Sequence, residues 1–204
     1  MNFILYHAMK ANKKKRKSFA SVFPMITILG MSIISLCSYY EPDWHFDWNG
    51  IRPEIKDTIL VAKNHSIDDR YTGYAGRISN QYLRQQWLMN HASAYELQKL
   101  TEYPNGAVKA IAYSGLFQNA SVKDKTSIAL KAIQDTVSKI YYTSGCTGDQ
   151  MNLSQYIMEN MLFNNMYYSS GTNGELREEY NFTVSQKEKI LTTYSKVQNL
   201  SSDN

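Results

Sequence analysis

Residues 93–116 read SAYELQKLTEYPNGAVKAIAYSGL, and they carry the clearest structural signals of the chain. Ser93, followed three residues later by Glu96, is a capping box, in which each side chain bonds the other residue's backbone N–H at the start of a helix. Pro104 cannot continue this helix, because it lacks a backbone N–H and biases the residue before it away from helical angles. The segment therefore predicts a short helix that ends before Pro104.

Two further helices are predicted after the turn at Asn105-Gly106. The first has one apolar face, with residues at the spacing i, i+3, i+4 and i+8: Val108, Ile111, Ala112 and Leu116. A second start signal, Ser121 to Asp124, precedes a longer apolar stripe: Ile128, Ala129, Ala132, Ile133, Val137 and Ile140. Short connections of this kind favour antiparallel helix neighbours.

Residues 92–137 resemble a HEAT-type helical hairpin. The resemblance rests on Leu97-x-x-Leu100, on Pro104-Asn105 at the turn, and on Val108-Lys109 opening the second helix, with Lys109 where arginine is more usual. No clean second copy follows at a period of about 40 residues, as a long array would need. The resemblance implies a scaffold-like helical fold whose usual role is interaction with another protein. The candidate interaction residues are Lys109, Tyr113 and Trp87.

The rest of the body also predicts helices. Apolar residues at helical spacing indicate helices near residues 51–62, 82–91, 153–163 and 185–200, the last opening with the capping box Ser185 to Glu188. Residues 64–76 and 164–184 are rich in glycine and polar residues and are predicted loops. We expect an all-α fold, a short α-solenoid-like array of antiparallel helix pairs after an N-terminal apolar helix.

The positive charge of the chain belongs to its N-terminus. Residues 1–37 hold six basic residues and no acidic one, so the remainder has 16 basic and 18 acidic residues out of 22 and 18 in all. The folded part is therefore close to neutral, which argues against a nucleic-acid partner. The basic run Lys13–Lys17 is followed by an uncharged segment, Phe19–Tyr40. This order is typical of a secretory signal or a signal anchor.

Three fates of residues 1–40 remain open: cleavage, retention as an anchor, or lipidation of Cys37. The sequence Ile34-Ser35-Leu36-Cys37 resembles a bacterial lipoprotein box, but Leu36 stands where a small residue is expected. Each fate places the body outside the cytoplasm, at the periplasmic or extracellular face of the cell envelope, with the membrane as one partner. We expect a linker over residues 41–54, a helical domain over 55–200 and a frayed tail at 201–204.

No catalytic, cofactor or metal site emerges from the sequence. The four histidines, His7, His45, His65 and His91, are scattered, and neither a phosphate-binding loop nor a nucleophile elbow is present. Cys146 has no histidine downstream of it to act as a local base. We therefore predict no catalytic residue, no metal ligand and no cofactor.

The sequence favours an envelope-associated helical scaffold that binds an unidentified protein and is not an enzyme. Two alternatives stay open. One is an exported hydrolase-like enzyme in which folding brings together Asp68, Asp69 and Asp135. The other is a binding module for a small ligand, with Trp87 and nearby tyrosines lining a pocket between helices.

Overall fold

The computed structural model describes residues 24–35, 45–74, 76–163 and 176–202. The chain divides into two units, residues 1–44 and 45–204, which are considered separately. Several predicted features fall outside the described residues: Cys37 with its lipidation signal, the basic run, residues 164–175 of the second predicted loop and residues 203–204 of the tail.

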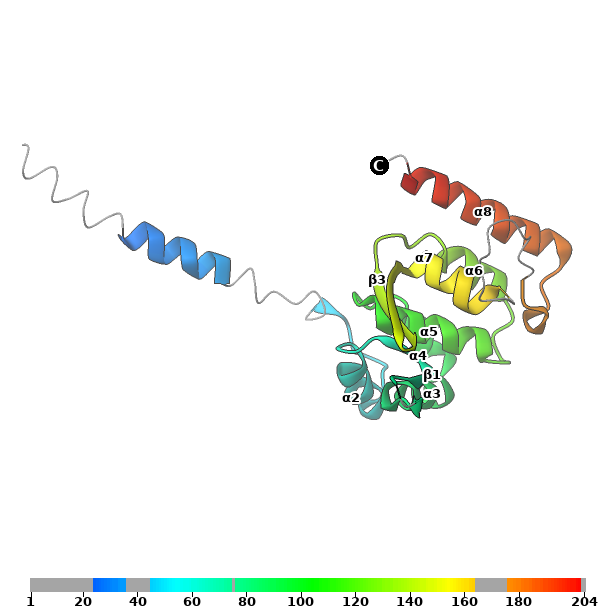
Figure 1. The fold of residues 1–204 in the computed structure, drawn as a ribbon, viewed down its shortest axis with the longest axis horizontal. Coiled ribbons are helices and arrows are strands. Elements are labelled where there is room, and N and C mark those ends of the chain that lie inside the picture. The colour runs from blue at the N-terminus through cyan, green and yellow to red at the C-terminus, as the bar shows by residue number, and fades with distance from the viewer. Residues whose placement is uncertain (1–23, 36–44, 75, 164–175, 203–204) are drawn as a thin grey trace, which may run out of the picture. The chain divides into compact units, whose positions relative to one another are not determined.

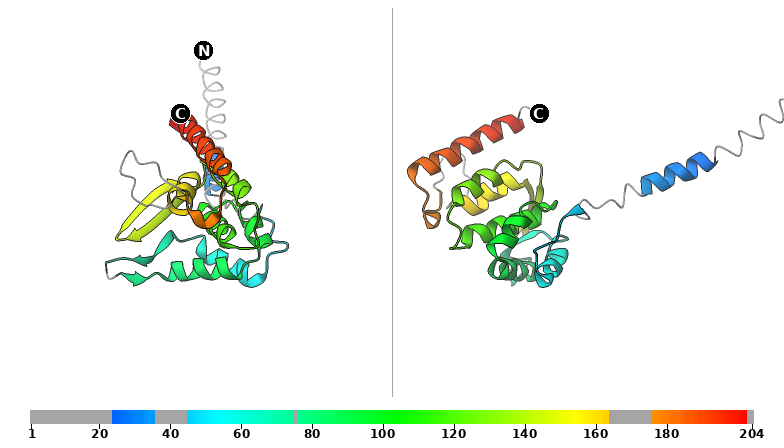
Figure 2. Two further views of the ribbon diagram at one scale, coloured as in Figure 1. Left: turned by 90° about the vertical axis from the view of Figure 1, so that its right-hand side faces the viewer. Right: turned by 180° about the vertical axis from the view of Figure 1, so that it is seen from behind.

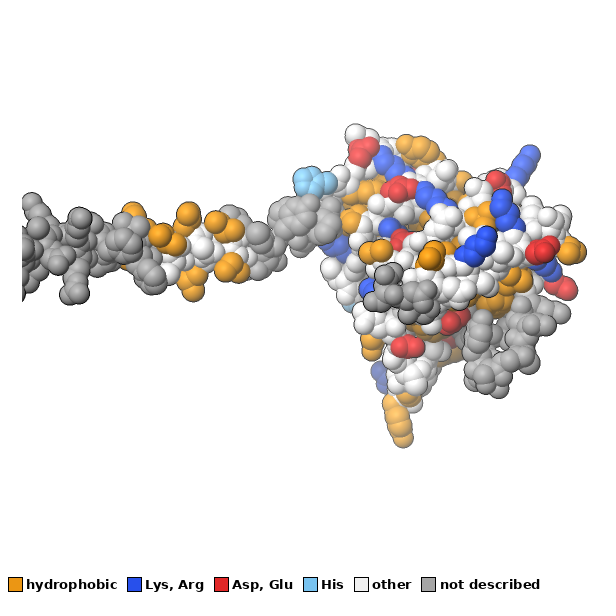
Figure 3. Space-filling model, turned by 90° about the horizontal axis from the view of Figure 1, so that it is seen from above, with side chains coloured by type: hydrophobic (Ala, Val, Ile, Leu, Met, Phe, Trp, Pro, Cys, Tyr) orange, Lys and Arg blue, Asp and Glu red, His pale blue; other side chains and the backbone are white. Residues whose placement is uncertain are grey.

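In the first unit, residues 24–35 form a helix. Its large apolar side chains are all more than half exposed, as the orange atoms along this helix show in Figure 3: Met25, Ile26, Ile28, Leu29, Met31, Ile33 and Ile34. Among the described residues, no helix has both the length and the apolar character needed to cross a membrane.

The second unit contains a four-stranded mixed sheet with the strand order β2-β1-β3-β4. β1 (Ile67–Thr72) is antiparallel to β2 (Arg77–Ile78) and parallel to β3 (Lys139–Gly145), which is antiparallel to β4 (Thr147–Asn152). The two hairpins project to the same side of the domain (Figure 2, left). Gly145 turns the second hairpin with φ +57°, a left-handed conformation that glycine adopts without a steric penalty.

The helices pack around α5, which lies at the centre of the domain (Figure 1). The unit contains α2 (Pro53–Ala62), α3 (Asn80–His91), α4 (Ala94–Leu100), α5 (Gly106–Gln118), α6 (Lys125–Ala132), α7 (Leu153–Tyr156) with the π-helical segment η2 (Ile157–Leu162), the short 3-10 turn η3 (Glu178–Tyr180) and α8 (Val184–Ser202). Eleven of the thirteen α5 residues are buried. A helix that is apolar all round belongs in a core, and small residues such as Ala110 and Gly115 let its neighbours approach closely.

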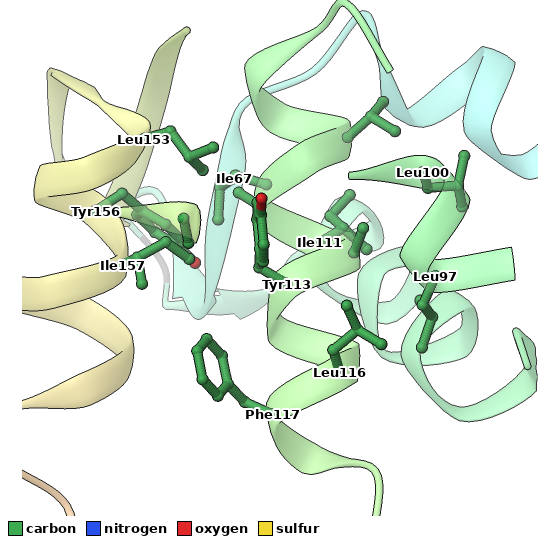
Figure 4. Close-up of a cluster of buried hydrophobic side chains, with 14 of the residues drawn as sticks. Ile67, Leu97, Leu100, Ile111, Tyr113, Leu116, Phe117, Leu153, Tyr156 and Ile157 are labelled. Atoms are coloured by element: carbon green, nitrogen blue, oxygen red, sulfur yellow. The ribbon is translucent and has the colours of Figure 1, made fainter. Parts of the chain in front are cut away.

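The core extends to both sides of α5. Figure 4 shows Leu97 and Leu100 of α4 on one side of that helix, and Leu153, Tyr156 and Ile157 on the other. The linker segment before α2 also contributes aromatic rings. Phe46 and Trp48 pack edge-on against Tyr103, with ring centroids 4.9 Å and 5.5 Å from it.

The prediction of an all-α, solenoid-like fold was wrong, because the domain is an α/β fold with a mixed sheet. The third helix of the HEAT-like region ends at Ala132, and Val137 is 84% exposed. Ile140, which the helical stripe included, is a buried residue of β3. The predicted loop at residues 64–76 contains β1.

Several local predictions were confirmed. The capping box of Ser93 and Glu96 is formed at the start of α4, and α5 packs against that helix. Ile55, Ile59 and Ala62 form the buried face of α2. The capping box of α8 is formed two residues earlier than predicted, by Thr183 and Gln186, whose side chains each accept a hydrogen bond from the other's backbone N–H.

Candidate functional site

A polar patch occupies one end of the sheet face that packs on the helices. Side chains alternate along a strand, and Ile67 pairs with Tyr142, so Ile67, Asp69, Tyr142 and Ser144 share this face. Ile67 is buried in the core, whereas the Ser144 hydroxyl lies 3.1 Å from Asp69 Oδ2 and donates to it. The face therefore changes from apolar to polar where the hairpins leave the core.

Helix α3 forms a second wall beside β1. Ser79 caps the helix, accepting hydrogen bonds from two backbone N–H groups of its first turn. Four residues at the spacing i, i+3, i+4 and i+7 lie on the face of α3 that lines the site: Tyr82, Gln85, Gln86 and Met89. The buried Gln85 amide ties the helix to the strand: in the amide orientation that satisfies both of its polar atoms, it accepts from the Asp68 backbone N–H at 2.9 Å and donates to the Asp68 carbonyl at 3.1 Å.

The third wall is the π-helical segment η2. It continues α7, which Asn152 caps by accepting a hydrogen bond from Gln155 N, and it presents Asn160 and Met161 toward α5. Single turns of π-helix are rare and occur frequently at functional sites. The wider turn here displaces the side chains that follow Tyr156 relative to a regular α-helix.

These walls line a partly open cavity of about 190 Å³, which we call the main cavity. β1, α3, α5, β3, α7 and η2 all line it, together with Arg177. A neighbouring cavity of about 210 Å³, the hairpin cavity, lies between the β3–β4 hairpin and η2, where Asp149 and Glu159 line it. Tyr142 and Asn160 line both cavities and so separate them.

The carboxylates of the main cavity bond neutral donors. Asp68 accepts hydrogen bonds from the hydroxyls of Ser66 and Ser79. Asp69 accepts from Ser144 and, at 2.9 Å, from the backbone N–H of Arg70. Neither carboxylate has an ion pair with any described residue.

Two tyrosines of the main cavity, Tyr142 and Tyr156, have raised pKa values and are neutral at physiological pH. Burial raises the pKa of Tyr142, and the negative charge of Asp69 raises it further. Burial likewise raises the pKa of Tyr156, which is 6% exposed, and the neighbouring Tyr142 adds to this effect. Both rings therefore keep their hydroxyl protons and are available as hydrogen-bond donors.

Arg177 is held at the edge of the main cavity by its own hydrogen bonds. Its Nε donates to the Phe163 carbonyl and its Nη2 to the Asn160 carbonyl, each at 3.1 Å. Its Nη1 lies 3.4 Å from a carboxylate oxygen of Glu179. The guanidinium thus satisfies carbonyl groups at the end of η2, where the last carbonyls of a helix have no partner within it.

The structure distributes the residues singled out in the sequence over several places. Asp68 and Asp69 both line the main cavity, but Asp135 does not, because its Oδ2 lies 2.7 Å from Lys109 Nζ near Ser138. Trp87 stacks on His91, with centroids 4.5 Å apart, and does not line the cavity.

The remaining candidates lie away from the main cavity. Tyr113 is 3% exposed and belongs to the core. Lys109 is largely buried by its ion pair. Cys146 is exposed at the tip of the second hairpin. Within the described residues, no group of three histidine, cysteine or carboxylate side chains is arranged to hold a metal ion.

Sequence reasoning missed Tyr142, Tyr156, Asn160 and Arg177 as members of one site. A signal for Tyr142 existed, since KIYYTSG (residues 139–145) alternates and is rich in strand-forming residues. No comparable signal marks the others, because α7 and η2 reach the cavity only through their packing against α5, and Arg177 only through its hydrogen bonds to the end of η2. In comparisons with known proteins, no family model, curated protein or solved structure matches this chain.

Proposed function

We propose that the domain over residues 45–202 is a binding module for a small polar ligand, which occupies the main cavity. The observation that carries the proposal is the convergence of carboxylate, amide and tyrosine side chains from six elements on one cavity beside the core. Ligand pockets typically combine apolar walls with a few placed polar groups. At about 190 Å³ the cavity is smaller than the roughly 300 Å³ at which pockets for drug-sized ligands begin, so it suits a small metabolite.

The walls of the main cavity are held in position before any ligand binds. Gln85 ties α3 to β1, the Ser144–Asp69 bond ties β3 to β1, and Arg177 closes the end of η2. A preorganised site loses less conformational entropy on binding than a flexible one. This rigidity supports binding over the helical scaffold role, whose solenoid fold is not present.

We also propose that the domain works in the cell envelope. Two observations support this location: the basic run Lys13–Lys17 ahead of an uncharged segment, and the apolar side chains exposed all along residues 24–35. Exposed apolar surface of this kind favours a lipid or protein environment over water. Fractionation of cells that produce the tagged chain tests the location, and recovery of the full-length chain in the cytosol would count against it.

A blocked-cavity experiment tests the ligand proposal. Gln86 lines the main cavity from α3, and its side chain is partly exposed, so a larger side chain fits at this position. Gln86→Trp should therefore block the opening of the main cavity. Gln98→Trp is the matched control, because Gln98 is exposed on α4 and does not line the cavity. A screen of small polar fragments by ligand-observed NMR should find binders that the first variant loses and the second keeps. Binders that survive Gln86→Trp unchanged would refute the proposal.

A further inference from the structure

We infer that the ligand is an organic cation, an amine whose ammonium group is bound by the carboxylates around Tyr142. This inference rests on the proposed function and adds the chemical class of the ligand. The inference draws on both cavities. Tyr142 and Asn160 line each of them, so a short flexible ligand meets these two side chains from either cavity.

The first argument is the charge of the lining. Asp68 and Asp69 line the main cavity, and Asp149 and Glu159 line the hairpin cavity. None of the four has an ion pair with a described residue. Glu159 accepts a 3.0 Å hydrogen bond from the Gln155 amide, and burial raises its pKa, an effect that a bound cation would oppose. Carboxylates without a cationic partner beside a cavity attract a positive group and repel an anion.

The second argument is that the protein itself supplies little compensating charge here. Arg177 is the basic residue in the lining of the two cavities, and its three guanidinium nitrogens already face two carbonyls and Glu179. Residues 164–175, which precede it in the chain, contain no lysine or arginine. Among the described residues, an anionic ligand would therefore face carboxylates and no lining cation that is not already engaged.

The third argument is the aromatic lining. Tyr82, Tyr142 and Tyr156 surround the main cavity, and the face of an aromatic ring attracts a cation within about 6 Å of its centre. The carboxamides of Gln86 and Asn160 offer oxygen atoms that accept from an ammonium group. A carboxylate oxygen, the face of a tyrosine ring and an amide oxygen can each accept one of the three N–H donors of a protonated primary amine.

The test compares three probes of equal chain length: cadaverine, pentanediol and glutarate. Each has five carbon atoms, and their end groups are ammonium, hydroxyl and carboxylate. Isothermal titration calorimetry on the full chain should show cadaverine binding at least about tenfold more tightly than pentanediol, with glutarate weakest, because hydrogen bonds to charged groups exceed neutral ones by about that factor.

Two variants and one control locate the binding. Asp69→Asn should weaken cadaverine about tenfold, since it removes one charge from the lining of the main cavity, and Glu159→Gln should weaken it less, since Glu159 lines the hairpin cavity beyond Tyr142. Asp57→Asn changes the net charge equally on the exposed face of α2, outside both cavities, and should leave the affinity unchanged. Thermal unfolding of each variant checks that the fold is retained.

Each other result overturns the inference. Equal binding of all three probes, or preference for glutarate, would show that charge does not select the ligand; if Gln86→Trp then abolished that binding, the proposed function would still stand. An equal loss with Asp57→Asn would show a non-specific charge effect. If none of the probes bound, the amine assignment would be wrong, and the fragment screen would decide the proposed function separately.

Discussion

Glu96 links three helices through hydrogen bonds. Its replacement by glutamine tests how much these bonds contribute to the free energy of unfolding. The carboxylate is 2% exposed and accepts hydrogen bonds from Arg52 N at 2.9 Å, Arg52 Nε at 3.0 Å and Ser93 N at 2.8 Å. Arg52 precedes α2 and also donates to the His91 carbonyl at the end of α3. One carboxylate thus links the start of α2, the end of α3 and the start of α4.

The expected magnitude follows from the pKa of Glu96. Burial acts to raise this pKa, but the hydrogen bonds from Arg52 and Ser93 outweigh burial and lower it from 4.5 to about 2. Such a lowering is equivalent to about 3 kcal/mol of stability near neutral pH. Because the Arg52 side chain is 49% exposed, solvent screening reduces the expected loss in Glu96→Gln to about 2 kcal/mol.

The pH dependence has a definite sign. A carboxyl group whose folded pKa is depressed stabilises the fold above its unfolded pKa, and this stabilisation disappears as the pH falls through the folded pKa. The difference between the wild-type chain and Glu96→Gln should therefore be constant above about pH 5 and shrink to less than half by about pH 3.

Urea unfolding at several pH values measures this difference. Glu102→Gln is the matched control, because Glu102 is 65% exposed and pairs with Lys131 on the surface, so its loss should cost less than about 1 kcal/mol. A Glu96→Gln effect no larger than that of the control, or one that persists unchanged at about pH 3, would refute the reasoning.

Three further variants test the packing around α5 and the second hairpin. Leu97→Ala should cost about 2 to 5 kcal/mol in urea unfolding, because the side chain is fully buried, whereas a cost below about 1 kcal/mol would show that the site collapses. Gly106→Ala should lower the melting temperature, since an added Cβ would lie 2.2 Å from the Lys139 carbonyl oxygen, and an unchanged melting temperature would contradict that close approach between α5 and β3. Gly145→Ala should cost about 1 to 2 kcal/mol because φ is +57°, and a neutral result would mean that the turn is not left-handed in solution.

The sequence predicted helices where local signals agree with packing. The Ser93–Glu96 capping box, the apolar face of α2 and the end of α3 at His91 all depend on residues close together in the chain. Helix starts are specified by one or two side chains that satisfy the first backbone N–H groups. Such signals act within a few residues and depend little on distant packing, although the capping box of α8 forms two residues earlier than its signal at Ser185.

The sheet was missed because its signals are weak or ambiguous. Asp68 and Asp69 are poor strand formers, and β1 is stabilised by its pairing with β3, some 75 residues later in the chain. Ile133, Val137 and Ile140 also fit a helical spacing, so the short apolar segment could not be assigned by periodicity alone. In both segments, β1 and β3, pairing between strands far apart in the chain determined the secondary structure.

The candidate site was predicted in part. The sequence proposed that folding brings together the carboxylates of Asp68, Asp69 and Asp135, and the structure brings only the first two to the main cavity. It proposed that Trp87 and nearby tyrosines line a pocket between helices, and of these Tyr82 lines the cavity while Trp87 does not. The missing members, Tyr142, Tyr156, Asn160 and Arg177, come from β3, α7, η2 and the segment before η3, whose positions depend on long-range packing that one sequence does not reveal.

A crystal structure of the full chain grown with cadaverine tests the central claim most directly. The account predicts electron density for the amine in the main cavity, with its nitrogen within hydrogen-bond distance of Asp69 and its carbon chain against Tyr142. Density for the amine only on the outer surface of the domain, with the main cavity occupied by water alone, would contradict the account.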